Sequence, residues 1–248
     1  MLVKDWMSEH VITLDENVSI MKAIQVLKEH KIRRIPVTRE GKLVGIVTDR
    51  DIKEATPSKI TTFEVHELYY LLSELKLKDI MTKDPLTVRP DDTVEYAAVL
   101  MLENKISGLP VVNEEGQVVG IITQTDIFKL FVNITGIYYS PYQISLLINH
   151  SYELSDLFDI LKRFQVSIYS LLTWKEEMAL PMESAVQEEK PSDTKRLVFI
   201  RFEEVSSEKL ELVLKELNQR FRVIYCIKED ISKLPHKEVK VLEELSLI

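Results

Sequence analysis

The first half of the chain contains one pattern twice. The stretch "VKDWMSEHVITL" (3–14) aligns with "LKDIMTKDPLTV" (77–88), and "KIRRIPV" (31–37) with "KISGLPV" (105–111), at an offset of 74 residues. The offset becomes 75 when "GIVTDRDI" (45–52) is aligned with "GIITQTDI" (120–127). The extra residue falls in a turn that contains Gly41 in the first copy and Gly116 in the second. A match of this length, interrupted once and in a turn, predicts two copies of one structural unit.

Each copy predicts the same order of elements, namely a short strand, a helix, two strands joined by a turn, and a second helix. The strands are expected at 11–14, 35–38 and 43–47 in the first copy, and at 86–88, 109–112 and 118–122 in the second. The second helices are expected to begin near Asp51 and Asp126. Asp92 and Glu95 have the spacing of a capping box before an earlier helix.

A threonine and an aspartate follow the last strand of each copy: Thr48 and Asp51, then Thr123 and Asp126. Both residue types cap helices, because their oxygens accept backbone N–H groups. A strand-to-helix turn can also hold phosphate on its free N–H groups, and an aspartate can accept both hydroxyls of a ribose. The presence of the pair in both copies favours ligand binding, and plain capping remains the alternative.

The doubled pattern (KDWMS and KDIMT, RIPV and GLPV, GIVTDRD and GIITQTD) resembles a pair of cystathionine-β-synthase (CBS) domains, also called a Bateman module. The resemblance covers about residues 1–132. It implies an α+β fold with two β-α-β-β-α repeats at 1–60 and 77–134, separated by a linker helix at 61–76. It also implies a regulatory protein that binds an adenosine-containing ligand between the repeats. The linker resembles that of bacterial acetoin-utilisation CBS proteins, which points to acetoin or carbon metabolism.

The resemblance implies two unequal ligand sites. Site A comprises Arg33, Arg34, Thr48, Asp51, Leu86, Ile106 and Ser107. In it Thr48 and Asp51 take phosphate and ribose, the arginines add phosphate contacts, and the other three residues form a wall for adenine. The weaker site B comprises Ile12, Ile32, Thr123 and Asp126. Its basic positions are filled by Ser107 and Gly108, which cannot neutralise a phosphate, whereas a guanidinium donates two parallel hydrogen bonds to one.

The expected ligand is therefore an adenine nucleotide, AMP, ADP or ATP, at site A. The resemblance also implies a homodimer, and a regulated protein that the residues do not identify. A structural homodimer with degenerate, empty sites is the alternative. No nucleophile with a base, paired-carboxylate cleft or metal cluster is recognisable, so we do not expect an enzyme. Asp49 and Asp51 are spaced as a D-x-D metal motif, but the second copy has Gln124 in place of Asp49.

The second half predicts a different unit. Residues 137–231 give the order β-α-β-β-α-β of a ferredoxin-like domain and resemble the ACT domain, a regulatory module. Residues 175–195 within it are acidic and expected to form a mobile loop, and residues 232–248, which follow it, are expected to be a tail. ACT domains that bind amino acids usually carry glycine after the first strand. Here that turn is "NHSYELS", and all six glycines precede residue 137, so dimerisation is the simpler expectation.

Composition narrows the remaining possibilities. A formal charge of −8 and a pI near 5.3 argue against a general binder of nucleic acid or anionic membranes. No apolar run approaches the roughly 20 residues of a membrane helix, and the start lacks the pattern of a signal peptide. Cys226 stands alone, and the histidines show no metal-ligand spacing. We therefore expect a cytoplasmic chain without a metal.

Overall fold

The computed structural model describes residues 1–55, 74–175 and 195–234. The chain divides into two compact units, Met1–Leu130 and Phe131–Ile248. The linker helix predicted at 61–76, the loop at 175–195 and the tail at 232–248 lie almost wholly outside the described residues.

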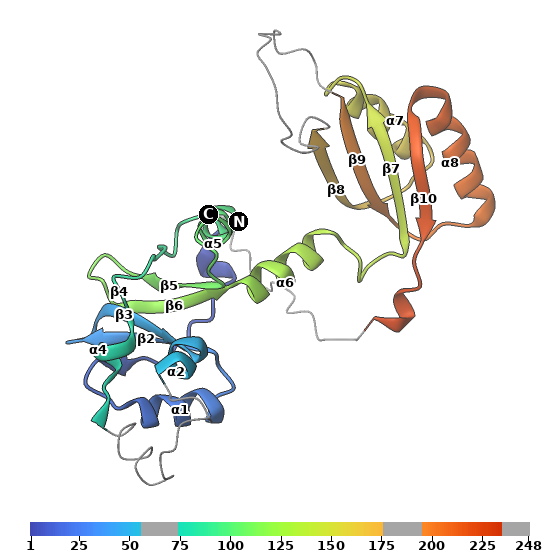
Figure 1. Cartoon of the computed structure of the whole chain (residues 1–248). Helices are drawn as coiled ribbons and strands as arrows, with labels where there is room; N and C mark the ends of the chain where they lie inside the picture. Colours follow the sequence, from blue (N-terminus) through green and yellow to red (C-terminus); the bar gives the residue numbers. More distant parts are fainter. Residues whose placement is uncertain (56–73, 176–194, 235–248) are drawn as a thin grey trace, which may run out of the picture. The chain divides into compact units, whose positions relative to one another are not determined.

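The first unit contains the two predicted repeats (Figure 1). The first repeat comprises β1 (Leu14–Asp15), α1 (Ile20–Glu29), β2 (Arg34–Arg39), β3 (Lys42–Thr48) and α2 (Asp49–Ala55). The second comprises α5 (Val94–Glu103), β5 (Gly108–Val112), β6 (Val118–Thr123) and α6 (Gln124–Ile134). The short strand β4 (Thr82–Lys83) precedes it and pairs with β3 of the first repeat. Short helices precede the repeats, η1 (Val3–Asp5) and α4 (Leu77–Ile80). The predicted hairpins are confirmed, and Gly41 and Gly116 turn them with φ of +79° and +80°, which favour glycine.

Two local predictions are wrong. The first strand of each copy is shorter than expected, since β1 has only two residues and its counterpart is a single bridge between Val88 and Val111. The start of α5 is not a capping box of Asp92 and Glu95. Thr93 is the N-cap, and its side chain accepts from the backbone N–H of Tyr96 at 3.1 Å. Asp92 instead accepts from the backbone N–H of Arg89, because it lies one residue before the cap.

Each repeat has its own apolar core, formed mainly by its first helix and its hairpin. The segment that precedes each repeat packs on the other repeat. Val3 N–H donates to the carbonyl of Asp92 at 2.8 Å, and Leu77 N–H donates to the carbonyl of Val18 at 2.9 Å. The two repeats therefore exchange their leading segments, which ties them into one unit.

Glycine in the G-I-[VI]-T motif is explained by this exchange. A Cβ at Gly45 would collide with the side chain of Met81, and a Cβ at Gly120 would collide with that of Met7. Met81 precedes the second repeat but packs on the strand of the first, and Met7 precedes the first repeat but packs on the strand of the second. The K-D-x-M and G-I-[VI]-T motifs are therefore two halves of one packing contact that occurs twice.

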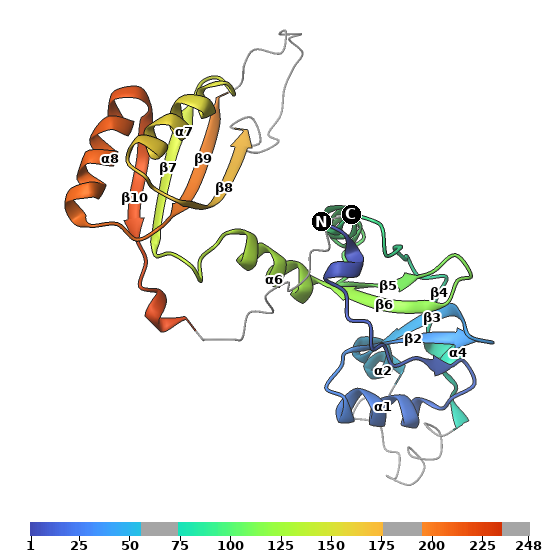
Figure 2. The same cartoon turned by 180° about the vertical axis from the view of Figure 1, so that it is seen from behind.

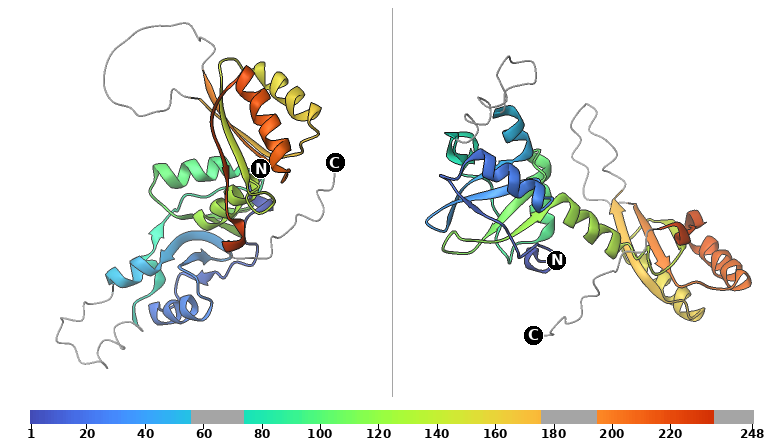
Figure 3. Two further views of the ribbon diagram at one scale, coloured as in Figure 1. Left: turned by 90° about the vertical axis from the view of Figure 1, so that its right-hand side faces the viewer. Right: turned by 90° about the horizontal axis from the view of Figure 1, so that it is seen from below.

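The second unit is a four-stranded antiparallel sheet with two helices. Its elements are β7 (Tyr142–Ile148), α7 (Glu153–Arg163), β8 (Ile168–Lys175), β9 (Arg196–Phe202), α8 (Ser207–Arg220), β10 (Arg222–Lys228) and η3 (Ile231–Lys233). The strands are ordered β10-β7-β9-β8, and α7 and α8 lie side by side on one face of the sheet (Figures 2 and 3). The element order is the predicted β-α-β-β-α-β, and the assignment to the ACT domain stays a prediction.

A buried arginine holds the segment that enters this unit. Arg201, on β9, is 3% exposed. Its Nε donates to the carbonyl of Thr135 at 3.1 Å, one terminal nitrogen donates to the carbonyl of Ser140 at 2.8 Å, and the other pairs with Glu229 at 2.8 Å. The guanidinium is thus fully engaged, as a buried charge must be, and it fixes the chain just after α6.

Within the described residues, no helix is long and apolar enough to cross a membrane.

Candidate ligand-binding site

The Thr48–Asp51 turn has a defined hydrogen-bond pattern. Asp51 Oδ2 accepts from the backbone N–H of Thr48 and from Thr48 Oγ1, both at 2.7 Å. The backbone N–H of Asp51 in turn donates to Thr48 Oγ1 at 3.3 Å. Among the described residues, nothing donates to Asp51 Oδ1. One carboxylate oxygen therefore closes the turn, and the other remains available to accept the hydroxyls of a ligand.

The Thr123–Asp126 turn repeats the pattern with one difference. Asp126 Oδ2 accepts from the backbone N–H of Thr123 at 3.0 Å and from its hydroxyl at 2.7 Å. Asp126 Oδ1, however, pairs with Lys129 Nζ at 3.3 Å, and Asp126 is only 7% exposed. In the first repeat the position of Lys129 is occupied by Glu54, which is exposed. Asp126 is therefore less available to a ligand than Asp51.

Arg34 reaches from the first repeat into the second. It starts on β2 opposite Thr48, and one terminal nitrogen, Nη2, donates to Ser107 Oγ at 2.6 Å. The other, Nη1, is buried without a hydrogen-bond partner. Burial lowers the pKa of Arg34, as does the neighbouring Arg33, while Asp49 and Asp126 act in the opposite direction. A buried unpaired donor costs about 1–3 kcal/mol, which a phosphate oxygen could offset.

Gly108 provides the space for this guanidinium. A Cβ at Gly108 would lie inside the guanidinium of Arg34, 2.8 Å from its Cζ. Gly108 is also the position that aligns with Arg34 in the repeat. From the sequence, Gly108 is expected only to leave site B without a cation. The sequence signal for this contact is that an arginine aligns with a glycine, because the glycine leaves room for the arginine side chain.

The structure brings some predicted site residues together and leaves others apart. Arg34 and Ser107 of site A are in contact, as are the two Thr–Asp pairs. Ile106 packs against the core of the second repeat, and Ile12 and Ile32 pack against the core of the first. Arg33 and Leu86 are exposed, Leu86 by 43%. Within the described part of the chain, no hydrogen bond or ion pair joins the Arg33 side chain to Thr48 or Asp51.

The chemistry gathered here suits a sugar phosphate. It comprises a free carboxylate oxygen, a threonine hydroxyl and a guanidinium with an unpaired nitrogen. In the ranges that the structure describes, no group of three or more histidine, cysteine, aspartate and glutamate side chains is gathered that could hold a metal ion.

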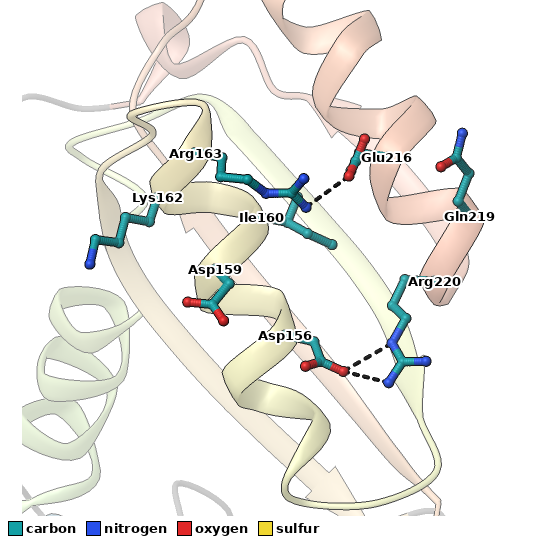
Figure 4. Close-up of a pocket in the computed structure, with 8 residues that line it drawn as sticks. All are labelled: Asp156, Asp159, Ile160, Lys162, Arg163, Glu216, Gln219 and Arg220. Carbon is teal, nitrogen blue, oxygen red and sulfur yellow. Dashed lines mark hydrogen bonds and ion pairs between the residues drawn. The ribbon is translucent and has the colours of Figure 1, made fainter.

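A groove in the second unit is a different kind of feature. It has a volume of about 910 Å³ and lies between α7 and α8 (Figure 4). Charged side chains bridge it, with Arg220 paired to Asp156 at 2.5 Å and Arg163 paired to Glu216 at 2.7 Å. These groups satisfy one another at the surface, where such pairs contribute little. The groove therefore presents no equivalent of the unpaired Arg34 nitrogen.

Comparison with known proteins places the repeats in a family. The family model for the CBS domain matches residues 3–58 and 77–133. A CBS domain-containing protein of Dictyostelium discoideum is 32% identical over 134 residues, which cover 54% of this chain and 92% of that protein. L-aspartate semialdehyde sulfurtransferase of Methanocaldococcus jannaschii is 40% identical over 131 residues, or 52% of this chain. The match spans only 23% of the length of that enzyme, and the match to inosine-5'-monophosphate dehydrogenase of Korarchaeum cryptofilum spans 22%.

Solved structures also match about half of the chain. The CBS domain pair of protein MJ0100, in complex with 5'-methylthioadenosine and S-adenosyl-L-methionine, is 38% identical, with coverage of 53% of this chain and 96% of that one and a TM-score of 0.45. CBSX2 in complex with AMP is 31% identical, with coverage of 54% and 97% and a TM-score of 0.45.

Proposed function

Because this chain belongs to the CBS domain family, we propose that it is a regulatory protein that binds an adenine nucleotide between its two repeats. The observation that carries the proposal is the pair of Thr–Asp turns, together with an arginine between the repeats that keeps an unpaired nitrogen. In this proposal the chain is not an enzyme. Its resemblance to the sulfurtransferase extends over 131 residues, which are only 23% of that protein.

The residues have distinct roles in the proposed complex. Asp51 Oδ1 accepts the ribose hydroxyls, while Thr48 and Arg34 contact the phosphate. Arg33 adds positive charge from the surface, and Leu86, Ile106 and Ser107 form the wall for adenine. The second site uses Thr123, Asp126, Ile12 and Ile32 and binds more weakly, because Lys129 already occupies Asp126.

We also propose a homodimer formed through the helices of the second repeat. Tyr96, Val99 and Leu102 recur at helical spacing on α5 and are 51%, 53% and 71% exposed. Phe128 on α6 is 67% exposed. Apolar patches of this kind on a folded protein mark interaction surfaces. A second copy is the simplest occupant, since an isologous contact lets one surface cover itself.

The remaining parts of the proposal rest on resemblance. The second unit is proposed as a ferredoxin-like ACT domain that contributes to dimerisation through its sheet. Acetoin metabolism is the process in which we expect the regulated partner, and the cytoplasm is the expected compartment.

The alternative is a structural homodimer whose ligand sites are empty. One observation favours it, because in both turns the aspartate already accepts a hydrogen bond from the backbone N–H of its own threonine. Thermal unfolding with a panel of adenosine compounds separates the two functions, since a ligand that binds only the folded state stabilises it. If no compound raises the melting temperature, the structural alternative holds.

Titration of adenosine, AMP, ATP and S-adenosylmethionine into the full chain tests the proposal. We expect AMP or ATP to bind about tenfold more tightly than adenosine, because phosphate adds charge-assisted hydrogen bonds to guanidinium. The preference should weaken as salt rises, since salt screens accessible charges. S-adenosylmethionine should bind poorly because its sulfonium is positive. Binding of S-adenosylmethionine equal to that of AMP would show that the arginines do not face the ligand.

A further inference from the structure

We propose that Arg34 is shared by the two ligand sites, so that one guanidinium serves whichever Thr–Asp turn holds a phosphorylated ligand. The two sites would then compete for one cation, and AMP bound at one would weaken AMP binding at the other. This inference rests on the proposed function, because it concerns the same two sites.

The first observation is the position of the guanidinium. Arg34 belongs to the first repeat by sequence, yet its terminal nitrogens lie on Ser107 and Gly108 of the second. Gly108 is the aligned counterpart of Arg34, so the side chain crosses toward its own equivalent position in the other repeat. Arg34 pairs with Thr48 across the first hairpin, and Gly108 pairs with Thr123 across the second. The side chain therefore runs from beside one turn to beside the other.

The second observation is the charge on either side. The carboxylates that act on Arg34 are Asp49, at the start of α2, and Asp126, at the start of α6. Among the described contacts neither forms a hydrogen bond with the guanidinium. Asp49 pairs with Lys53 and Asp126 pairs with Lys129, each at 3.3 Å. The one hydrogen bond of the guanidinium among the described residues is to Ser107. Arg34 is therefore attracted toward both turns and fixed to neither.

The third observation is that there is room for only one such cation. An arginine at position 108 would collide with Arg34, because even a Cβ there would overlap its guanidinium. Arg33 aligns with Ser107 and is exposed. The unpaired, buried Nη1 shows that this place between the repeats leaves hydrogen-bonding capacity unused. A phosphate at either turn would use it once the guanidinium turns out of this buried position, and the other turn would then lose its cation.

Exchange of the two residues tests the shared position. Arg34→Gly should weaken AMP binding by about tenfold or more, and the double variant Arg34→Gly/Gly108→Arg should restore it to within about threefold. The backbone at Gly108 does not have the positive φ that would exclude arginine. Adenosine affinity should change by less than about threefold in both variants. Arg39→Gln is the matched control, because Arg39 lies on the same strand and pairs with Glu16 instead.

Variants that keep only one Thr–Asp turn intact test whether Arg34 serves both ligand sites. They give an answer even if the Arg34→Gly/Gly108→Arg variant does not fold. Asp126→Ala leaves the first turn intact, and Asp51→Ala leaves the second. Addition of Arg34→Gln should weaken AMP binding in both backgrounds, measured by displacement of a fluorescent adenine nucleotide at millimolar AMP. A loss in only one background would overturn the inference and leave the proposed function standing. Failure of the unaltered chain to bind any adenosine compound would instead overturn the proposed function.

Discussion

The two repeats have the same backbone design, and their side chains differ at the proposed ligand sites and at the proposed dimer surface. At the first turn Asp51 is followed by Glu54 and keeps one oxygen free, whereas at the second Asp126 is paired with Lys129. Between the repeats, Arg34 faces Gly108. The comparison teaches that the common frame comes from glycine, threonine and apolar positions present in both copies, while the proposed differences in ligand affinity and in association rest on positions that differ.

The first helix of each repeat, α1 or α5, also has an exposed face that differs between the repeats. Positions Lys22, Gln25 and Lys28 on α1 align with Tyr96, Val99 and Leu102 on α5, and all six are exposed. A polar face can remain in water, whereas an apolar face of this extent is stabilised when it is covered. The second repeat is therefore the one expected to form the dimer contact.

The largest expected effect is on that contact. Val99→Lys should weaken the dimer by about a hundredfold, because it places an unpaired charge in an apolar interface. Gln25→Lys, at the aligned position of the first repeat, is the matched control and should leave the dimer intact. Light scattering at micromolar concentration checks both variants. An unaltered chain that is monomeric, near 28.8 kDa, would refute the homodimer.

A smaller and symmetric effect is expected where the repeats are alike. Gly45→Ala and Gly120→Ala should each destabilise the fold by about 1–3 kcal/mol, because the new methyl group overpacks against Met81 or Met7. Chemical denaturation measures the loss. The double variant Met7→Ala/Gly120→Ala should lose less stability than the sum of the two single variants, because the shorter side chain leaves room for the new methyl group. A strictly additive loss would argue against the contact.

The smallest expected effect concerns an ion pair found only in the first repeat. Arg39 lowers the pKa of Glu16 from its usual value of 4.5 through a hydrogen bond, and the aligned residues of the second repeat are Asn113 and Pro90. The stabilisation is present above the usual pKa and is lost as the pH falls through the lowered one. Glu16→Gln should therefore reduce the acid dependence of stability below about pH 4.5. Glu114→Gln, which removes an exposed pair in the second repeat, should not.

Much of the first unit could be predicted from sequence, because a pattern that occurs twice in one chain is unlikely to arise by chance. The hairpins, their glycine turns and both Thr–Asp turns follow from spacing that occurs twice. The cap of α5 was predicted wrongly, since Asp92 and Thr93 are both good caps and local spacing does not choose between them. The short first strands were also missed, because the leading segments exchange between the repeats and pair only briefly.

The path of Arg34 could not be predicted from local patterns. A long side chain that crosses between repeats depends on the space left by a glycine 74 residues away. The pairing of Asp126 with Lys129 was visible as an i,i+3 spacing, but its meaning depended on comparison with Glu54 in the first copy. For these residues, the aligned position in the other repeat was more informative than the neighbouring sequence.

Calorimetric titration of AMP into Asp51→Ala and Asp126→Ala tests the central claim, that the first turn binds the nucleotide more tightly than the second. We expect Asp51→Ala to lose about 1.5–3 kcal/mol of binding free energy, which is about tenfold or more in affinity. Asp126→Ala should lose less, because Lys129 already occupies that carboxylate. Asp159→Ala, an exposed residue of the second unit, serves as the control. Equal losses, or a larger loss for Asp126→Ala, would contradict the account.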